Sequence, residues 1–76
     1  MVMKIKEVSE KTGLTKKTIR FYEEEGLIQP EKTYYNGRAY RDYTQTHVDA
    51  LKEIAVLRRA RFSVEEIKAI SSAPEE

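Results

Sequence analysis

A short helix bracketed by two glycines occupies residues 13–28 and restricts what the rest of the chain can fold into. Thr15 is suited to begin this helix, because its hydroxyl can accept a hydrogen bond from an unpaired amide of the first turn. Gly26 stands where the helix must end, since glycine tolerates the left-handed backbone that commonly follows a last turn. The stretch therefore predicts one short helix with a defined start and a defined end.

The two faces of this helix carry different chemistry. Ile19, Tyr22 and Gly26 share one side at helical spacing, so that side is expected to pack into the core. The opposite side is predicted to be exposed and carries Lys16, Lys17, Arg20 and Phe21. Cations in the N-terminal half of a helix oppose the helix dipole, which is a small cost at an exposed site. This arrangement favours the binding of an external anion, and phosphate is the obvious candidate.

A second short helix is predicted just before this one. Ile5, Val8 and Thr12 give an amphipathic turn or two that ends at Gly13. Two short helices joined through a glycine turn are typical of a helix-turn-helix, whose second helix is the candidate for a DNA groove. The alternative is an ordinary helical hairpin.

Asn36-Gly37 is the strongest hairpin signal in the chain, because both residues tolerate the positive φ of a type I′ turn. Strands over residues 33–35 and 38–40 would pair across it, rich in tyrosine as strands prefer. The tip offers Asn36, the Gly37 amide and Arg38 as hydrogen-bond donors. This ribbon is a candidate wing beside the helix-turn-helix; the alternative is a plain surface hairpin whose tyrosines pack.

Two further helices follow the hairpin. Thr44 is expected to cap a longer helix that reaches about Arg61, with His47 in a capping or surface role in its first turn. Ser63 and Glu66 form the pattern of a capping box, which starts a last helix over residues 64–70. Beyond it, residues 72–76 are expected to form a flexible tail.

Composition narrows the functional classes. The 76 residues make one domain, contain no cysteine and include no apolar run of membrane-spanning length, so a cytoplasmic chain without membrane contact is expected. Net charge is only +1, but residues 11–21 and 32–41 are free of acids and contain aromatics, which suggests a polyanion surface. The alternative is a solvated charged face, which charge distribution alone would favour over a binding surface. With one histidine, no glycine-rich phosphate loop and too little chain for a cleft, we expect no enzyme, no catalytic residue, no metal and no cofactor.

Three sequence blocks, in this order, resemble the DNA-binding domain of the MerR family of bacterial transcription regulators. The blocks are Thr18-Ile19-Arg20-Phe21-Tyr22-Glu23 with Gly26-Leu27-Ile28, then Tyr40-Arg41-Asp42-Tyr43-Thr44, and finally Phe62-Ser63-Val64-Glu65-Glu66-Ile67. The resemblance covers residues 3–71. It implies a mainly α winged helix-turn-helix over residues 1–71, with four short helices and a two-stranded β-hairpin wing.

The resemblance also implies a site and partners. The second helix would enter the major groove of double-stranded promoter or operator DNA, and the wing would grip the flanking backbone. The candidate DNA-binding residues are Thr15, Lys16, Lys17, Thr18, Arg20, Phe21, Tyr22, Asn36, Gly37, Arg38, Tyr40 and Arg41. The full-length protein would be a homodimer that serves RNA polymerase indirectly by bending and untwisting a promoter. The 76 residues alone are expected to be mainly monomeric, because the sequence offers no apolar seam beyond the core.

Two departures from the family pattern and two alternative functions accompany this reading. Arg38-Ala39 lengthens the step from the wing turn to the second block, and Arg61 stands where the family commonly has glycine, so strain is expected there if the turn is left-handed. The alternatives are a small excisionase-type or architectural DNA-binding protein, and a winged-helix module for protein contacts. The module would show no salt-sensitive DNA affinity, and the two acid-free windows argue against it.

Overall fold

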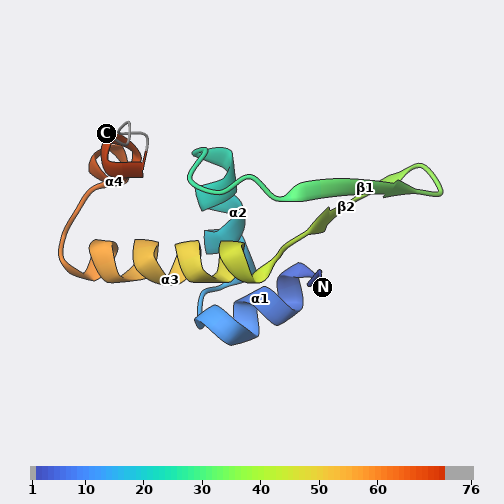
Figure 1. Cartoon of the computed structure of the whole chain (residues 1–76), viewed down its shortest axis with the longest axis horizontal. Coiled ribbons are helices and arrows are strands. Elements are labelled where there is room, and N and C mark those ends of the chain that lie inside the picture. Colours follow the sequence, from blue (N-terminus) through green and yellow to red (C-terminus); the bar gives the residue numbers. More distant parts are fainter. Residues whose placement is uncertain (1, 72–76) are drawn as a thin grey trace.

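The computed structural model describes residues 2–71, which form four helices and one two-stranded antiparallel sheet. The elements are α1 (Ile5–Thr12), α2 (Lys16–Glu24), β1 (Glu31–Tyr35), β2 (Arg38–Asp42), α3 (Gln45–Arg59) and α4 (Val64–Ser71). The β1–β2 ribbon projects from the helices at one end of the molecule, and α4 lies at the other (Figure 1). The predicted mainly α winged helix-turn-helix is confirmed. The tail predicted at residues 72–76 lies outside the described residues.

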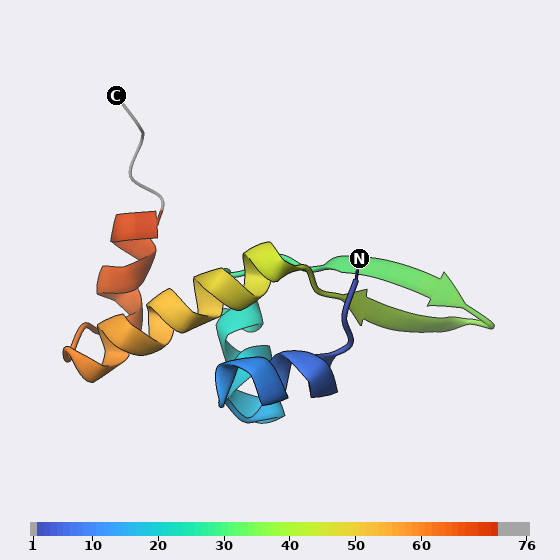
Figure 2. The same ribbon diagram turned by 60° about the horizontal axis from the view of Figure 1, so that its bottom comes forward.

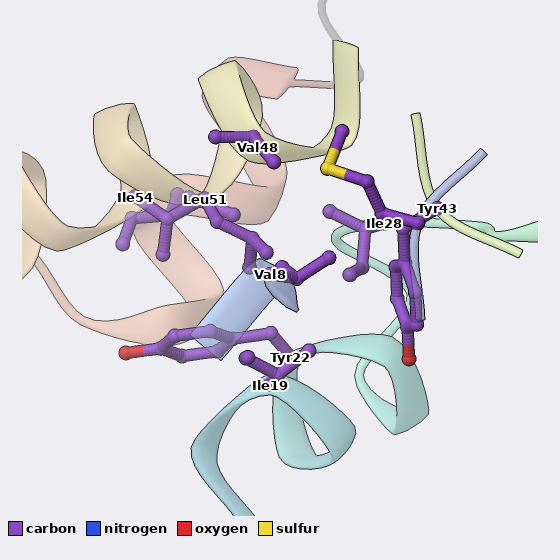
Figure 3. Packing of buried hydrophobic residues seen from close by; sticks show 10 residues of the cluster. Val8, Ile19, Tyr22, Ile28, Tyr43, Val48, Leu51 and Ile54 are labelled. Carbon is purple, nitrogen blue, oxygen red and sulfur yellow. The ribbon is translucent and has the colours of Figure 1, made fainter. Parts of the chain in front are cut away.

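One hydrophobic core joins the helices to the base of the ribbon. Val8 of α1, Ile19 of α2 and Leu51 of α3 are all fully buried, and Figure 3 shows them packed between α2 and α3. The other buried members of the core are Met3, Tyr22, Ile28, Tyr43, Val48, Ile54 and Ile67. Fully burying one such side chain contributes about 1.5–3 kcal/mol, so this cluster sets the packing of the fold. The predicted core face of α2 is confirmed for Ile19 and Tyr22, whereas Gly26 is exposed.

The helices α2 and α3 end in the same hydrogen-bonded motif. After α2, the Gly26 amide donates to the Glu23 carbonyl (3.0 Å) and the Leu27 amide to the Tyr22 carbonyl (2.9 Å). After α3, the corresponding bonds run from Arg61 to Arg58 (3.0 Å) and from Phe62 to Leu57 (3.1 Å). These two hydrogen bonds together form the Schellman motif, in which the first residue after the helix cap adopts a left-handed backbone. Gly26 does so with φ 83°, and Arg61 with φ 73°.

The start of each of the last two helices is capped as predicted. The Thr44 amide donates to Nδ1 of His47 (2.9 Å), so the lone histidine serves the N-terminus of α3. The Ser63 amide donates to Glu66 Oε1 (2.8 Å), and the Glu66 amide donates to the Ser63 hydroxyl (3.1 Å). This reciprocal pair is a complete capping box at α4.

The wing is longer than predicted. Asn36 (φ 50°) and Gly37 (φ 75°) form the expected two-residue turn, which pairs Tyr35 with Arg38. The ladder then continues past the predicted residues 33–35 and 38–40, down to the pair Glu31 and Asp42. The extension follows from what comes next in the chain.

Directly after β2, Tyr43 is fixed by the N-terminal segment. Its amide donates to the Met3 carbonyl (2.9 Å) and the Met3 amide donates to its carbonyl (2.7 Å). Figure 2 shows the N-terminal segment running past the base of the ribbon. Because β2 is held in an extended conformation at its end, β1 can pair along its whole length.

One other expectation needs correction. The helix α3 ends at Arg59 rather than at about Arg61, because the left-handed residue at position 61 ends the helical backbone. Outside the core, one large apolar side chain on α3 and one on α4 remain exposed. Val56 is 59% exposed and Ile70 is 52% exposed. None of the helices within residues 2–71 is long and apolar enough to cross a bilayer.

The matched helix ends lead to a stability prediction. Arg61→Gly should raise the free energy of unfolding by about 0.5–1 kcal/mol, because relief of the left-handed strain exceeds the extra entropy of glycine in the unfolded chain. Gly26→Ala, at the same position of the α2 motif, should lower it by about 1 kcal/mol, and a Cβ there would meet no atom within 4 Å. Urea unfolding followed by circular dichroism measures both; equal stabilities for the wild type and Arg61→Gly would contradict the prediction.

Candidate nucleic-acid interface

The solvent face of α2 carries the cations predicted for it. Lys16, Lys17 and Arg20 are exposed, and Phe21 beside them is 44% exposed. Within residues 2–71, these three cations form no ion pair and no hydrogen bond, so the alternative in which Arg20 pairs with Glu24 does not occur. A polyanion can therefore approach this face without displacing an internal partner.

The two threonines at the start of α2 are occupied by the helix itself. The Thr18 amide donates to the Thr15 hydroxyl (3.1 Å), and that hydroxyl donates to the Thr18 hydroxyl (2.8 Å). Thr15 thus caps α2 as predicted. Tyr22 differs from the other candidates on α2, because it is only 6% exposed and belongs to the core.

The wing presents its tip and its tyrosines to solvent. Asn36, Gly37 and Arg38 are exposed at the turn, and Tyr40 is partly exposed further along β2. Tyr34 and Tyr35 are 72% and 67% exposed, although sequence reasoning left open that they pack. Their place beside the Asn-Gly turn, in an acid-free window, was the signal that could have added them to the candidate residues.

Arg41 differs from the wing candidates at the tip, because a carboxylate of α2 holds its side chain. Its Nε lies 2.5 Å from Oε2 of Glu23, and the other carboxylate oxygen of Glu23 accepts a hydrogen bond from the Tyr43 hydroxyl at 3.4 Å. The hydrogen bond to Glu23 raises the pKa of the Arg41 guanidinium. Burial, with Glu23 nearby, raises the pKa of the Tyr43 hydroxyl to about 12, so Tyr43 stays protonated and remains a donor.

Lys4 is a cation at the wing base that sequence reasoning missed. Its Nζ lies 2.7 Å from Oδ1 of Asp42 and 5.4 Å from the centre of the Tyr40 ring. The Thr33 hydroxyl donates to the other oxygen of Asp42. The hydrogen bonds from Lys4 and Thr33 lower the pKa of Asp42. No local pattern could have revealed Lys4, because 38 positions separate it from Asp42.

A shallow hollow of about 360 Å³ connects α2 to the wing. Arg20 of α2 lines it together with Tyr40 and Arg41 of β2 and with Lys4. Arg20 of α2 and Arg41 of the wing therefore border the same hollow. A helix with unpaired cations beside a projecting β-ribbon is the arrangement of a winged helix-turn-helix that binds DNA.

Comparison with known proteins assigns the family. The profile of the MerR HTH family regulatory proteins matches residues 3–73, so the chain belongs to the MerR family and is the helix-turn-helix DNA-binding domain of a transcription regulator. The chain is 52% identical over 67 residues to the HTH-type transcriptional regulator CueR of Salmonella typhi. It is 47% identical over 68 residues to the HTH-type transcriptional regulator HmrR of Rhizobium leguminosarum bv. viciae. These relatives favour a regulator over the protein-contact module.

A solved structure shares the fold. The transcription regulator PbrR691 from Ralstonia metallidurans CH34, solved in complex with lead(II), superposes with a TM-score of 0.76 at 34% identity. The match covers 90% of this chain and 51% of that one. The matches to CueR and HmrR cover 84% and 90% of this chain but 45% and 50% of the relatives. The chain thus spans about half the length of these regulators.

The carboxylate at the wing base leads to a pH prediction. The folded-state pKa of Asp42 lies below its ordinary value of 3.8, so its contribution to stability is present above that value and is lost as the pH falls through the folded-state pKa. Asp42→Asn should therefore destabilise the domain at pH 7 and lose less stability than the wild type between pH 7 and pH 3. Urea unfolding at the two pH values measures this.

Asp49→Asn is the matched control, because Asp49 is an exposed carboxylate that accepts only from the neutral Gln45 amide among the described residues. Its acid dependence should follow that of the wild type. Parallel losses of stability for Asp42→Asn and the wild type would contradict the assigned role of Asp42.

Proposed function

We propose that this domain binds double-stranded promoter or operator DNA with α2 in the major groove and the β1–β2 wing on the flanking phosphate backbone. The base-reading residues would be Lys16, Lys17 and Arg20, with Phe21 in apolar contact beside them. A bidentate contact from arginine to guanine is the commonest specific contact in that groove.

One observation carries the proposal. The cations of α2 are exposed and unpaired within residues 2–71, while Ile19 and Tyr22 on the opposite face are buried. Arg20 also lines the same hollow as Tyr40 and Arg41. One duplex could therefore contact α2 and the wing together, which supports simultaneous base and phosphate contacts.

The wing would supply contacts that are independent of sequence. Asn36, the Gly37 amide and Arg38 can donate to phosphate oxygens, and the exposed ring of Tyr35 can pack against the sugars. Tyr22 is best explained by the core. Arg41 would contact phosphate only while it keeps its ion pair with Glu23.

The longer protein would use this domain in pairs. We infer a homodimer in the full-length regulator, acting in the cytoplasm, with one domain on each half-site of a symmetric operator. The support is the family and the length of the relatives, which is about twice that of this chain. By the same resemblance, bending and untwisting the promoter would serve RNA polymerase. The 76 residues alone would bind one half-site weakly.

Arg20 gives the sharpest test of the groove assignment. Arg20→Ala should cost about 1–3 kcal/mol of affinity for a selected half-site, with the free energy of unfolding nearly unchanged, because the side chain touches DNA and not the core. Arg20→Lys should restore most binding if the contact is to phosphate and little if it is bidentate to guanine. Fluorescence anisotropy with labelled duplexes measures each affinity.

Lys52→Ala is the control, since it removes the same charge from an exposed position on α3. It should weaken binding only by a small, sequence-independent amount. An Arg20→Ala affinity within a factor of two of the wild type would refute the placement of α2 in the groove.

The wing assignment makes a different prediction. Arg38→Ala should weaken all duplexes about equally and reduce the slope of log K against log salt by roughly 1, because one phosphate contact is lost. Titrations at several salt concentrations with selected and scrambled duplexes measure this. A loss confined to the selected duplex would show that the wing reads bases.

A further inference from the structure

The direction of the wing depends on its base. Every side chain at positions 31–40 is exposed, and the ribbon projects away from the helices (Figure 1). An isolated two-stranded ribbon is marginally stable in water, so its own ladder does not hold it at a fixed angle to the body. The angle must come from the contacts at positions 41–43.

Glu23 makes two of those contacts from α2. One carboxylate oxygen lies 2.5 Å from Nε of Arg41, and the other accepts from the Tyr43 hydroxyl at 3.4 Å. The Glu23 side chain is only 14% exposed, so this pairing is partly shielded from water. In Figure 3 the Tyr43 hydroxyl points toward α2, away from α3. The two oxygens therefore hold two different residues at the end of β2.

Glu23 also lies one turn after Arg20 on the helix that carries the unpaired cations. We propose that Glu23 is a positioning residue that sets the angle between α2 and the wing, so that both meet one DNA duplex at once. This inference rests on the proposed function. Glu23 itself touches no DNA; it acts through Arg41 and Tyr43.

The inference predicts that Glu23→Gln changes DNA affinity in the direction opposite to that expected from its charge alone. Replacing a carboxylate close to a DNA surface removes a negative charge, and that change alone should strengthen binding to the phosphate polyanion. If Glu23 holds the wing in its binding orientation, Glu23→Gln should weaken binding instead. A wing that adopts the competent angle for a third to a tenth of the time raises Kd about threefold to tenfold.

Glu24 provides the matched control. It neighbours Glu23 on α2, is exposed, and forms no ion pair or hydrogen bond with a side chain among residues 2–71. Glu24→Gln changes the charge by the same amount and should leave Kd unchanged or lower it. Glu23→Gln and Glu24→Gln should therefore move DNA affinity in opposite directions.

The wing angle can be measured directly because the chain has no cysteine. Tyr35→Cys near the wing tip and Lys52→Cys on α3 are both exposed positions for a pair of spin labels. Pulsed dipolar spectroscopy on the doubly labelled chain should give a narrow distance distribution. Adding Glu23→Gln should broaden it, and adding Glu24→Gln should leave it narrow.

Arg41→Gln tests the same contact from the wing side and serves if Glu23→Gln fails to fold. It should broaden the distribution, and the double variant should be no broader than Glu23→Gln alone, because Glu23→Gln already removes the ion pair with Arg41. A Glu23→Gln chain that keeps the wild-type distribution, or binds DNA more tightly than the wild type, overturns the inference. If the wild type binds no duplex, the proposed function fails, while the spin-label distances still decide the role of Glu23.

Discussion

The pairing of Tyr43 with Met3 is the constraint on which the rest of the structure depends. Two backbone hydrogen bonds join these residues, and the Tyr43 ring is fully buried in the core. Tyr43 follows the last residue of β2 and precedes the cap of α3, so the N-terminus, the wing and the longest helix meet at this one position. A ribbon too small to be stable alone is thereby anchored to a core that is stable.

The run of three acids on α2 has a structural explanation in this arrangement. Glu23 binds Arg41 at the wing base, and Glu25 binds Lys68 of α4 at 2.9 Å. Acids near a helix C-terminus oppose the dipole, and exposed ion pairs contribute at most about 1 kcal/mol each. Their main effect is therefore geometric. The acids at the end of α2 thus connect it to the wing and to α4, whereas the cations of its first half stay unpaired within residues 2–71.

The features that sequence reasoning predicted correctly are local ones. The caps at Thr15 and Ser63, the turn at residues 36–37 and the buried face of α2 each depend on residues within a few positions of one another. The features it missed join distant positions. The bonds of Arg41 to Glu23 and of Asp42 to Lys4 connect residues 18 and 38 positions apart. In a chain with 14 basic and 13 acidic residues, no local pattern selects those partners from the many possible ones.

Whether a cation already has an internal ion pair determines how much it is expected to contribute to DNA affinity. Lys16, Lys17 and Arg20 are exposed and unpaired within residues 2–71, so a phosphate or base could bind each of them without breaking an internal ion pair. Arg41 already holds the Glu23 carboxylate, which is partly shielded from water. A phosphate that took Arg41 from Glu23 would leave that carboxylate partly buried and unpaired, which would cancel much of the gain. Under the proposed function, discrimination between DNA sequences would therefore come from α2, while Arg41 would contribute by keeping the wing at the angle that α2 requires.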